Sequence, residues 1–155
     1  MADGEKRFRF KPRFRGLALG AVGIGATLGG VSIIALGAAL LPLATGAAGV
    51  ALGAAYLMSP TWKLEVVVDD EALEVRSPSA SKFRLPWTDV KRVVAATKTP
   101  SCFVDGGVPE KSLLVPGDGA PAPYDLEDKP GLCAAILAHV PADKVSKVDS
   151  LDRAR

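Results

Sequence analysis

Few side chains in this chain could do chemistry, and they form no known catalytic set. His139 is the only histidine, and Cys102 and Cys133 are the only cysteines. A structural zinc site needs about four such ligands, so these three residues predict no metal site. The sequence also lacks the nucleotide-binding, metalloprotease and serine-hydrolase motifs. We therefore expect a protein that is not an enzyme and that uses no cofactor and no metal.

The two cysteines permit one disulfide but do not make a disulfide framework. Their spacing contains no CxxC motif and no second pair. We expect Cys102 to lie in a strand and Cys133 on a helix, as reduced thiols that pack like small apolar side chains.

Two charged clusters are candidates for binding. The acidic cluster consists of Asp69, Asp70, Glu71 and Glu74. Its spacing differs from that of an EF-hand loop, so it indicates a solvated turn. The basic cluster consists of Lys82, Arg84, Lys91 and Arg92. These residues are our candidates for contact with anionic lipid headgroups at a bilayer, with ordinary surface charge as the alternative.

The elements that position these groups begin with a long uncharged run. The 47 residues from Gly16 to Trp62 include no Asp, Glu, Lys, Arg or His. Because one membrane span needs about 20 apolar residues, the segment 16–59 predicts a hairpin of two transmembrane helices, at about 16–36 and 40–58. A cleavable signal peptide has a much shorter apolar region. The absence of ionisable groups disfavours a pump or a secondary transporter.

Charge beside the first span predicts the orientation. Residues 1–15 carry six basic and two acidic groups. The positive-inside rule makes this segment a basic cytoplasmic head, and two spans return the chain to the cytoplasm. We expect a multi-pass protein of the inner (plasma) membrane with both termini cytoplasmic. The basic charge is then a topology signal, so we expect no nucleic-acid partner.

Small residues recur every four positions in both predicted spans. The two sets are Ala21, Gly25 and Gly29, and Thr45, Gly49 and Gly53. Such faces let helices approach closely in lipid. Folding the run near residue 37 sets the two faces opposite each other, which favours packing within the hairpin. Self-association of copies through the same faces is the alternative.

After Pro60 the pattern changes to short alternating runs. Period-two alternation predicts several short antiparallel strands, and a helical period follows from Pro130 until Pro141 ends it. We therefore expect one α+β domain at 60–141 and a disordered tail at 142–155.

Two stretches of this domain carry a resemblance to a known family. They are the predicted hairpin from Trp62 to Ser77 and residues 83–90, FRLPWTDV, which are similar to an "(I/L)PW-x-(D/E)-I" stretch. With the closing helix, the region resembles the bacterial PH-like (pleckstrin homology) domains attached to membrane helices. The resemblance implies a bent antiparallel sheet or partial barrel with a C-terminal helix. Eukaryotic relatives bind phosphoinositides through a basic turn, whereas the corresponding turn here, 69–71, is acidic.

Together these features predict a membrane-anchored, non-enzymatic interaction or scaffold module that presents a PH-like domain at the membrane surface. Its expected partners are the lipid bilayer and a protein that the sequence does not identify. A glycine-rich oligomeric channel or pore subunit with a regulatory tail is the alternative function.

Overall fold

The chain forms two compact units, a helical unit and a β unit. A computed structural model describes residues 4–35, 37 and 39–151. The helical unit extends from Pro12 to Pro60, and the β unit combines the chain up to Lys11 with the chain from Thr61 onward. Parts of the predictions for the head, the first span, the turn and the tail fall on residues 1–3, 36, 38 and 152–155, which lie outside the described residues.

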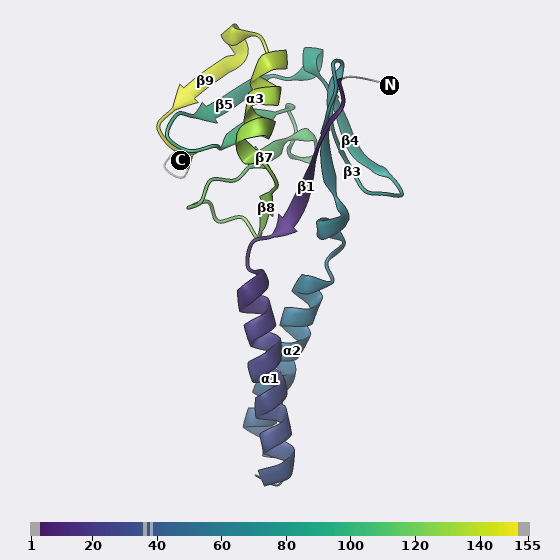
Figure 1. Cartoon of the computed structure of the whole chain (residues 1–155), viewed down its shortest axis with the longest axis vertical. Coiled ribbons are helices and arrows are strands. Elements are labelled where there is room, and N and C mark those ends of the chain that lie inside the picture. Colours follow the sequence, from purple (N-terminus) through teal and green to yellow (C-terminus); the bar gives the residue numbers. More distant parts are fainter. Residues whose placement is uncertain (1–3, 36, 38, 152–155) are drawn as a thin grey trace. The chain divides into compact units, whose positions relative to one another are not determined.

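The helical unit is a pair of antiparallel helices, α1 (Arg15–Ala35) and α2 (Leu40–Leu57) (Figure 1). Both are long and apolar enough to cross a membrane. Large apolar side chains point outward along the pair; Ile34 is 87% exposed and Leu40 is 83% exposed. A large exposed apolar surface is unfavourable in water. It is favourable in the hydrocarbon of a bilayer, which is itself apolar. The predicted pair of apolar helices is therefore present.

Side-chain hydrogen bonds fasten both ends of the helical pair. At the turn, the buried Ser32 hydroxyl donates to the carbonyl of Ala39 at 2.8 Å. Gly37 has a φ of 61°, in the left-handed region that favours glycine. At the other end, the Phe14 N–H donates to the Tyr56 hydroxyl at 3.0 Å. The Phe14 contact satisfies an N–H group that the start of a helix leaves without a partner in the helix, and the turn contact satisfies the buried Ser32 hydroxyl.

The β unit contains two sheets. The first has the order β4-β3-β2-β1-β8, and the second has the order β7-β6-β5-β9. The strands of the first sheet are β1 (Lys6–Pro12), β2 (Glu65–Val68), β3 (Ala72–Arg76), β4 (Ser81–Pro86) and β8 (Tyr124–Leu126). The strands of the second sheet are β5 (Arg92–Ala96), β6 (Cys102–Asp105), β7 (Leu113–Val115) and β9 (Val145–Val148). The strands β1 to β4 pair antiparallel in succession, as do β5 to β7.

Strand β1 belongs to the β unit although it precedes both helices in the chain. Its side chains alternate, with Arg7 and Arg9 exposed and with Phe8 and Phe10 only 5% and 8% exposed in the core. It pairs antiparallel with β2, which follows the helices. The structure thus differs from the prediction of a separate basic head at 1–15 and of a domain that begins at residue 60. The reason is that burial of Phe8 and Phe10 in the core stabilises the pairing of β1 with the rest of the sheet.

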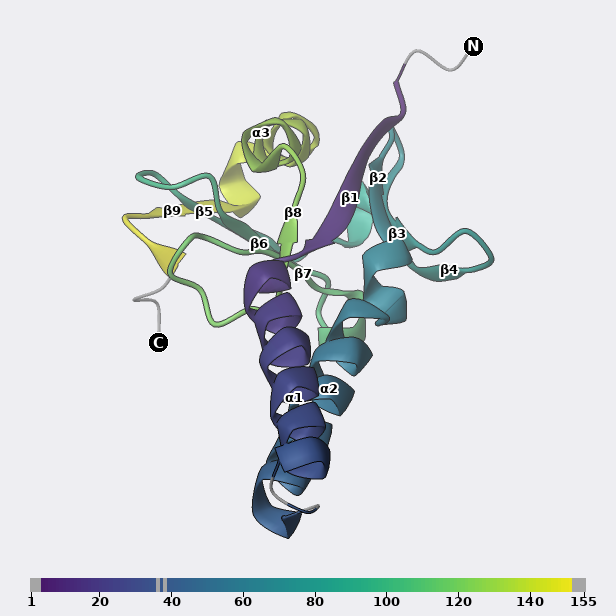
Figure 2. The same ribbon diagram turned by 60° about the horizontal axis from the view of Figure 1, so that its bottom comes forward.

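One hydrophobic core lies between the two sheets and helix α3 (Lys129–His139) (Figures 1 and 2). Leu132 and Ile136 of α3 are fully buried in it. The predicted closing helix is therefore present. It begins after Asp128, whose carboxylate accepts a hydrogen bond from the Gly131 N–H at 3.1 Å.

The end of the chain is more ordered than predicted. Strand β9 pairs in parallel with β5, with Val145 opposite Val93. Val145 is partly buried against the core. The prediction of a disordered tail from residue 142 is therefore wrong for β9, because this apolar side chain and the free edge of β5 hold it in the sheet.

Candidate functional site

The four basic residues that the sequence singled out are divided between the two sheets. Lys82 and Arg84 lie on β4 of the first sheet, whereas Arg92 begins β5 of the second sheet and Lys91 directly precedes it. Lys82 borders a hollow that also includes Glu110.

Arg84 is engaged by the acidic cluster. Its guanidinium lies 3.2 Å from the carboxylate of Asp69, 3.3 Å from that of Glu71 and 3.5 Å from that of Glu74. Three carboxylates around one arginine leave it little capacity for a lipid phosphate. The acidic cluster thus offsets the charge of Arg84, one of the four residues predicted to contact headgroups.

The turn between β2 and β3 is held by Asp69. Its Oδ1 accepts hydrogen bonds from the N–H groups of Glu71 and Ala72, at 2.8 and 2.7 Å. Partial burial acts to raise the pKa of Asp69, but these two N–H donors and Arg84 outweigh burial, so this pKa lies below its ordinary value. The carboxylate is thus a structural element of the turn.

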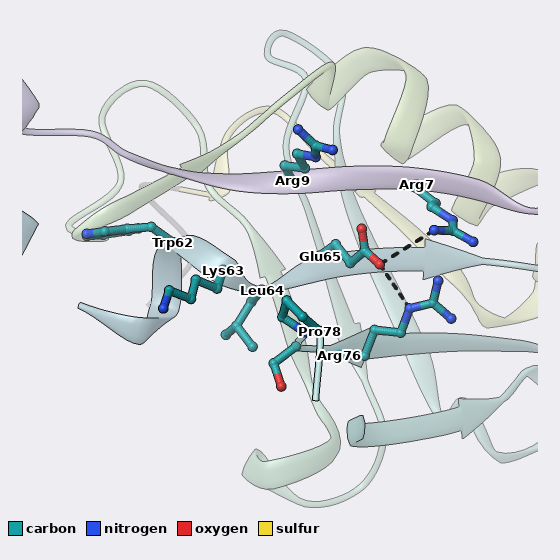
Figure 3. A pocket seen from close by; sticks show the side chains of 9 residues that line it. Arg7, Arg9, Trp62, Lys63, Leu64, Glu65, Arg76 and Pro78 are labelled. Carbon is teal, nitrogen blue, oxygen red and sulfur yellow. Dashed lines mark hydrogen bonds and ion pairs between the residues drawn. The ribbon is translucent and has the colours of Figure 1, made fainter. Parts of the chain in front are cut away.

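A different basic group lines a pocket of about 650 Å³ on the outer face of the first sheet (Figure 3). We call it the basic pocket. Its lining residues are Arg7, Arg9, Trp62, Lys63, Leu64, Glu65, Arg76, Ser77 and Pro78. Four of these side chains are cationic and one is anionic. The volume is within the range of small-molecule sites.

Strand register brings three of these charged side chains into one row. Arg9 on β1 lies opposite Glu65 on β2, and Glu65 lies opposite Arg76 on β3. Arg7 lies two residues before Arg9, so both side chains point to the same face. Residues that precede the helices in the sequence therefore meet residues that follow them at this pocket.

Two carboxylates hold two of the arginines in place. Glu65 Oε1 accepts a hydrogen bond from Arg76 Nε at 3.0 Å and lies 4.0 Å from Arg7 Nη1 (Figure 3). Glu5 Oε1 accepts from Arg7 Nε at 3.1 Å and from Arg76 Nη2 at 2.9 Å. The hydrogen bond to Glu65 contributes most to raising the pKa of Arg76, so its guanidinium stays charged.

The other two cations of the pocket have no such partner. Within residues 4–35, 37 and 39–151, neither Arg9 nor Lys63 makes an ion pair, and both are exposed. The apolar walls of Trp62, Leu64 and Pro78 lie beside them. A pocket with two uncompensated cations can bind an anionic group such as a phosphate, because charge-assisted hydrogen bonds to phosphate are among the stronger polar contacts.

Sequence reasoning did not identify this pocket. It assigned the basic residues of 1–15, Arg7 and Arg9 among them, to membrane topology and did not single out Lys63. The alternation Arg7-Phe8-Arg9-Phe10 was a usable strand signal, because alternate apolar residues are typical of a half-buried strand. The spacing of apolar residues within that strand does not predict that it pairs with β2, which follows both helices in the chain.

Glycines lie at the contact between α1 and α2. A Cβ atom added to Gly25 would lie 2.6 Å from the Gly46 carbonyl oxygen, and one on Gly53 would lie 2.7 Å from that of Ala18. A Cβ on Gly49 would lie 3.1 Å from the Ala21 carbonyl oxygen. These distances are too short for larger residues, so the helices approach at backbone contact.

The contact row on α2 differs from the predicted row at one end. Thr45 is exposed, and its hydroxyl donates to the Leu41 carbonyl at 2.9 Å. Gly46 takes the interior position instead and lies against the backbone of Gly29. A row of positions 46, 49 and 53 follows the helical period more closely than strict steps of four.

In the described part of the chain, no group of three or more His, Cys, Asp or Glu side chains is placed to hold a metal ion.

In comparisons with known proteins, no family model, no curated protein and no solved structure matches the chain.

Proposed function

We propose that this protein is a membrane-anchored, non-enzymatic interaction module whose basic pocket binds the phosphate group of anionic lipids. The observation that carries the proposal is the pair of uncompensated cations, Arg9 and Lys63, in one pocket and close in sequence to the ends of the apolar helices. The helices are the proposed anchor, and the β unit is the proposed interaction domain.

Chain connectivity supports a site close to the bilayer. Arg9 lies six residues before Arg15, where α1 begins, and Lys63 lies six residues after Leu57, where α2 ends. Six extended residues span at most about 20 Å. If the helices cross a membrane, both cations stay within that chain length of it, which is close to the region where anionic lipids attract basic groups.

The orientation and the domain class are part of the proposal. The basic residues of 1–15 favour a cytoplasmic location for the β unit at the plasma membrane of a bacterial cell. The succession β1–β4, β5–β7 and α3 is compatible with a PH-like domain in which the two helices are inserted between the first two strands. A specific protein partner would then meet this domain at the membrane surface.

The test uses the full chain in detergent micelles. The chain is incubated with phosphatidylglycerol or with phosphatidylcholine, and the lipid it retains is counted by native mass spectrometry. We expect preferential retention of phosphatidylglycerol, and we expect the double variant Arg9→Gln/Lys63→Gln to lower its affinity about tenfold, as for the loss of two modest ionic contacts. The matched control Lys91→Gln/Arg92→Gln removes the same charge from the second sheet and should retain the lipid like the wild type.

Two outcomes would contradict the proposal. One is equal retention of phosphatidylglycerol by the wild type and Arg9→Gln/Lys63→Gln. The other is an equal loss in both double variants, which would indicate attraction by net charge alone. Inorganic phosphate is added in a parallel arm; if it displaces the lipid at millimolar concentration, the pocket recognises free phosphate and not a headgroup held in the membrane.

A further inference from the structure

We propose that Cys102 and Cys133 are a modification site: a thiol pair that a hydroperoxide converts into an intramolecular disulfide, which ties α3 to the second sheet. This inference is independent of the basic pocket. It changes the expectation of two inert reduced thiols, because the fold brings the only two cysteines of the chain together.

The two sulfur atoms are already in contact. Cys102 Sγ and Cys133 Sγ lie 3.4 Å apart, although the residues are 31 positions apart in sequence. A disulfide bond is about 2.05 Å long, so small side-chain rotations bring the atoms to bonding distance. Two apolar residues of similar size could pack equally well at these positions, so packing alone does not require sulfur on both sides.

The surroundings favour pairing of these thiols with each other. Cys102 is fully buried in the middle strand of β7-β6-β5, and Cys133 on α3 is 9% exposed. A bulky thiol from another chain therefore reaches neither sulfur easily, whereas a small peroxide can reach Cys133 through local opening of α3. Among the described residues there is no third thiol to compete.

Exposure distinguishes the two sulfurs, and the electrostatics agree with it. The hydrogen bond between them and the charge of Lys129 lower the pKa of Cys133 despite its burial. The pKa of Cys102 is raised by that hydrogen bond and by burial. Because Cys133 is 9% exposed and Cys102 is fully buried, Cys133 is the sulfur that a peroxide reaches first, and Cys102 is the resolving thiol.

The reaction balances in two steps. The Cys133 thiolate attacks one oxygen of the hydroperoxide; the S–O bond forms, the O–O bond breaks, and the leaving alkoxide or hydroxide takes a proton. Cys102 then loses its proton and attacks Cys133 sulfur; the S–S bond forms, and the S–O bond breaks to release water. The two thiols are oxidised by two electrons, and the peroxide is reduced.

The disulfide closes the chain segment that contains β7 and β8 and fixes α3 to β6. Closing a loop of this length restricts the unfolded chain, so the oxidised form is expected to be more stable. In a reducing compartment the disulfide forms when a hydroperoxide is present and is reduced again afterwards. In an oxidising compartment the disulfide is permanent.

The experiment uses the full chain in detergent, reduced with dithiothreitol, freed of reductant and then treated with one equivalent of hydrogen peroxide. Expected results are the joint loss of both thiols, an intact mass lower by two hydrogen atoms, and a peptide that links Cys102 to Cys133. The Tm should rise by roughly 10 °C and return after dithiothreitol. In the Cys102→Ala variant, hydrogen peroxide should oxidise Cys133 to a sulfenic or sulfinic acid, and no intramolecular disulfide should form.

Three results would overturn the inference. The folded chain could keep both thiols under conditions that oxidise the urea-unfolded chain. Oxidation could produce only disulfide-linked dimers. Wild-type Cys133 could accumulate as a sulfinic acid while Cys102 stays reduced. The wild-type protein alone decides among these results, so the test does not depend on whether a cysteine variant folds.

Discussion

Arg9 of β1 lies directly opposite Glu65 of β2 in an antiparallel pair, although both apolar helices separate these residues in the chain. Strand pairing requires the two residues to lie on the same side of any membrane that the helices cross. A hairpin of two spans satisfies this requirement, and one span does not. The β unit is therefore a domain with a helical insertion, and not a tail that follows an anchor.

The first prediction concerns the boundaries of the β unit. Residues 61–155 alone should not fold, because they lack Phe8 and Phe10 and leave β2 as an exposed edge. The loss of each buried phenylalanine costs about 3–5 kcal/mol, and the two losses together are comparable with the whole stability of a small domain. We expect no cooperative thermal transition by circular dichroism.

The matched control restores the missing strand. Residues 4–11 joined through a short Gly/Ser loop to residues 61–151 should give a soluble domain with a cooperative transition and dispersed NMR signals. A folded 61–155 fragment, with the same stability as this joined chain, would show that β1 is not needed.

The second prediction concerns the helix contact. Gly25→Ala should loosen the hairpin, because its Cβ would lie 2.6 Å from the Gly46 carbonyl oxygen. Gly23→Ala is the matched control, because a Cβ at Gly23 meets nothing within 4 Å and alanine is the better helix former. In micelles, Gly25→Ala should lower the helix melting temperature, and Gly23→Ala should leave it unchanged or raise it.

A larger loss of helix stability in Gly23→Ala than in Gly25→Ala would contradict this prediction. If Gly23→Ala is the disruptive change, and cross-linking in membranes shows that it dissolves an oligomer, the outward glycines of α1 carry the important contact. The glycine-rich pore would then be the better description of the hairpin.

The third prediction concerns pH. The folded-state pKa of Asp69 lies below its ordinary value of 3.8, so its contribution to stability is present above that value and is lost as pH falls through the lower folded pKa. Asp69→Asn should therefore be less stable than the wild type at neutral pH, and the difference should shrink below about pH 4. Tm values between pH 3 and 7 check this, with exposed Glu110→Gln as a control for the loss of one carboxylate, which should match the wild type at neutral pH.

The sequence predicted well those features that local patterns encode. The uncharged run indicated two helices, and the helical period after Pro130 indicated α3. The β strands after residue 60 followed from period-two alternation. Each of these signals lies within one segment of the chain, where the spacing of apolar residues decides which face is buried.

The features that were missed depend on contacts between distant segments. β1 was hidden because its arginines also fit a topology signal, and its pairing with β2 joins residues on either side of the helices. β9 was missed because its parallel pairing with β5 offers no local turn to read. Arg84 was assigned to lipid because the sequence does not show that the 69–74 carboxylates fold back upon it.

The last prediction is that removing a negative charge from the basic pocket raises its affinity for phosphatidylglycerol. Glu65 is the one carboxylate among its described lining residues, and it lies between Arg7 and Arg76. Glu65→Gln keeps the size of the side chain, removes its negative charge and leaves Arg7 and Arg76 paired with Glu5 alone. We expect phosphatidylglycerol to bind about three- to tenfold more tightly in native mass spectrometry, since one unit charge near a partly exposed site is worth about 1 kcal/mol.

The control for this gain is Glu74→Gln, which removes the same charge from β3 beside Arg84, outside the pocket lining. It should leave lipid affinity near the wild-type value. The gain of Glu65→Gln should also shrink as salt is raised, because screening weakens exposed charge interactions. Unchanged or weaker lipid binding by Glu65→Gln, in a variant that keeps its thermal transition, would show that Arg7 and Arg76 serve the sheet and not a ligand.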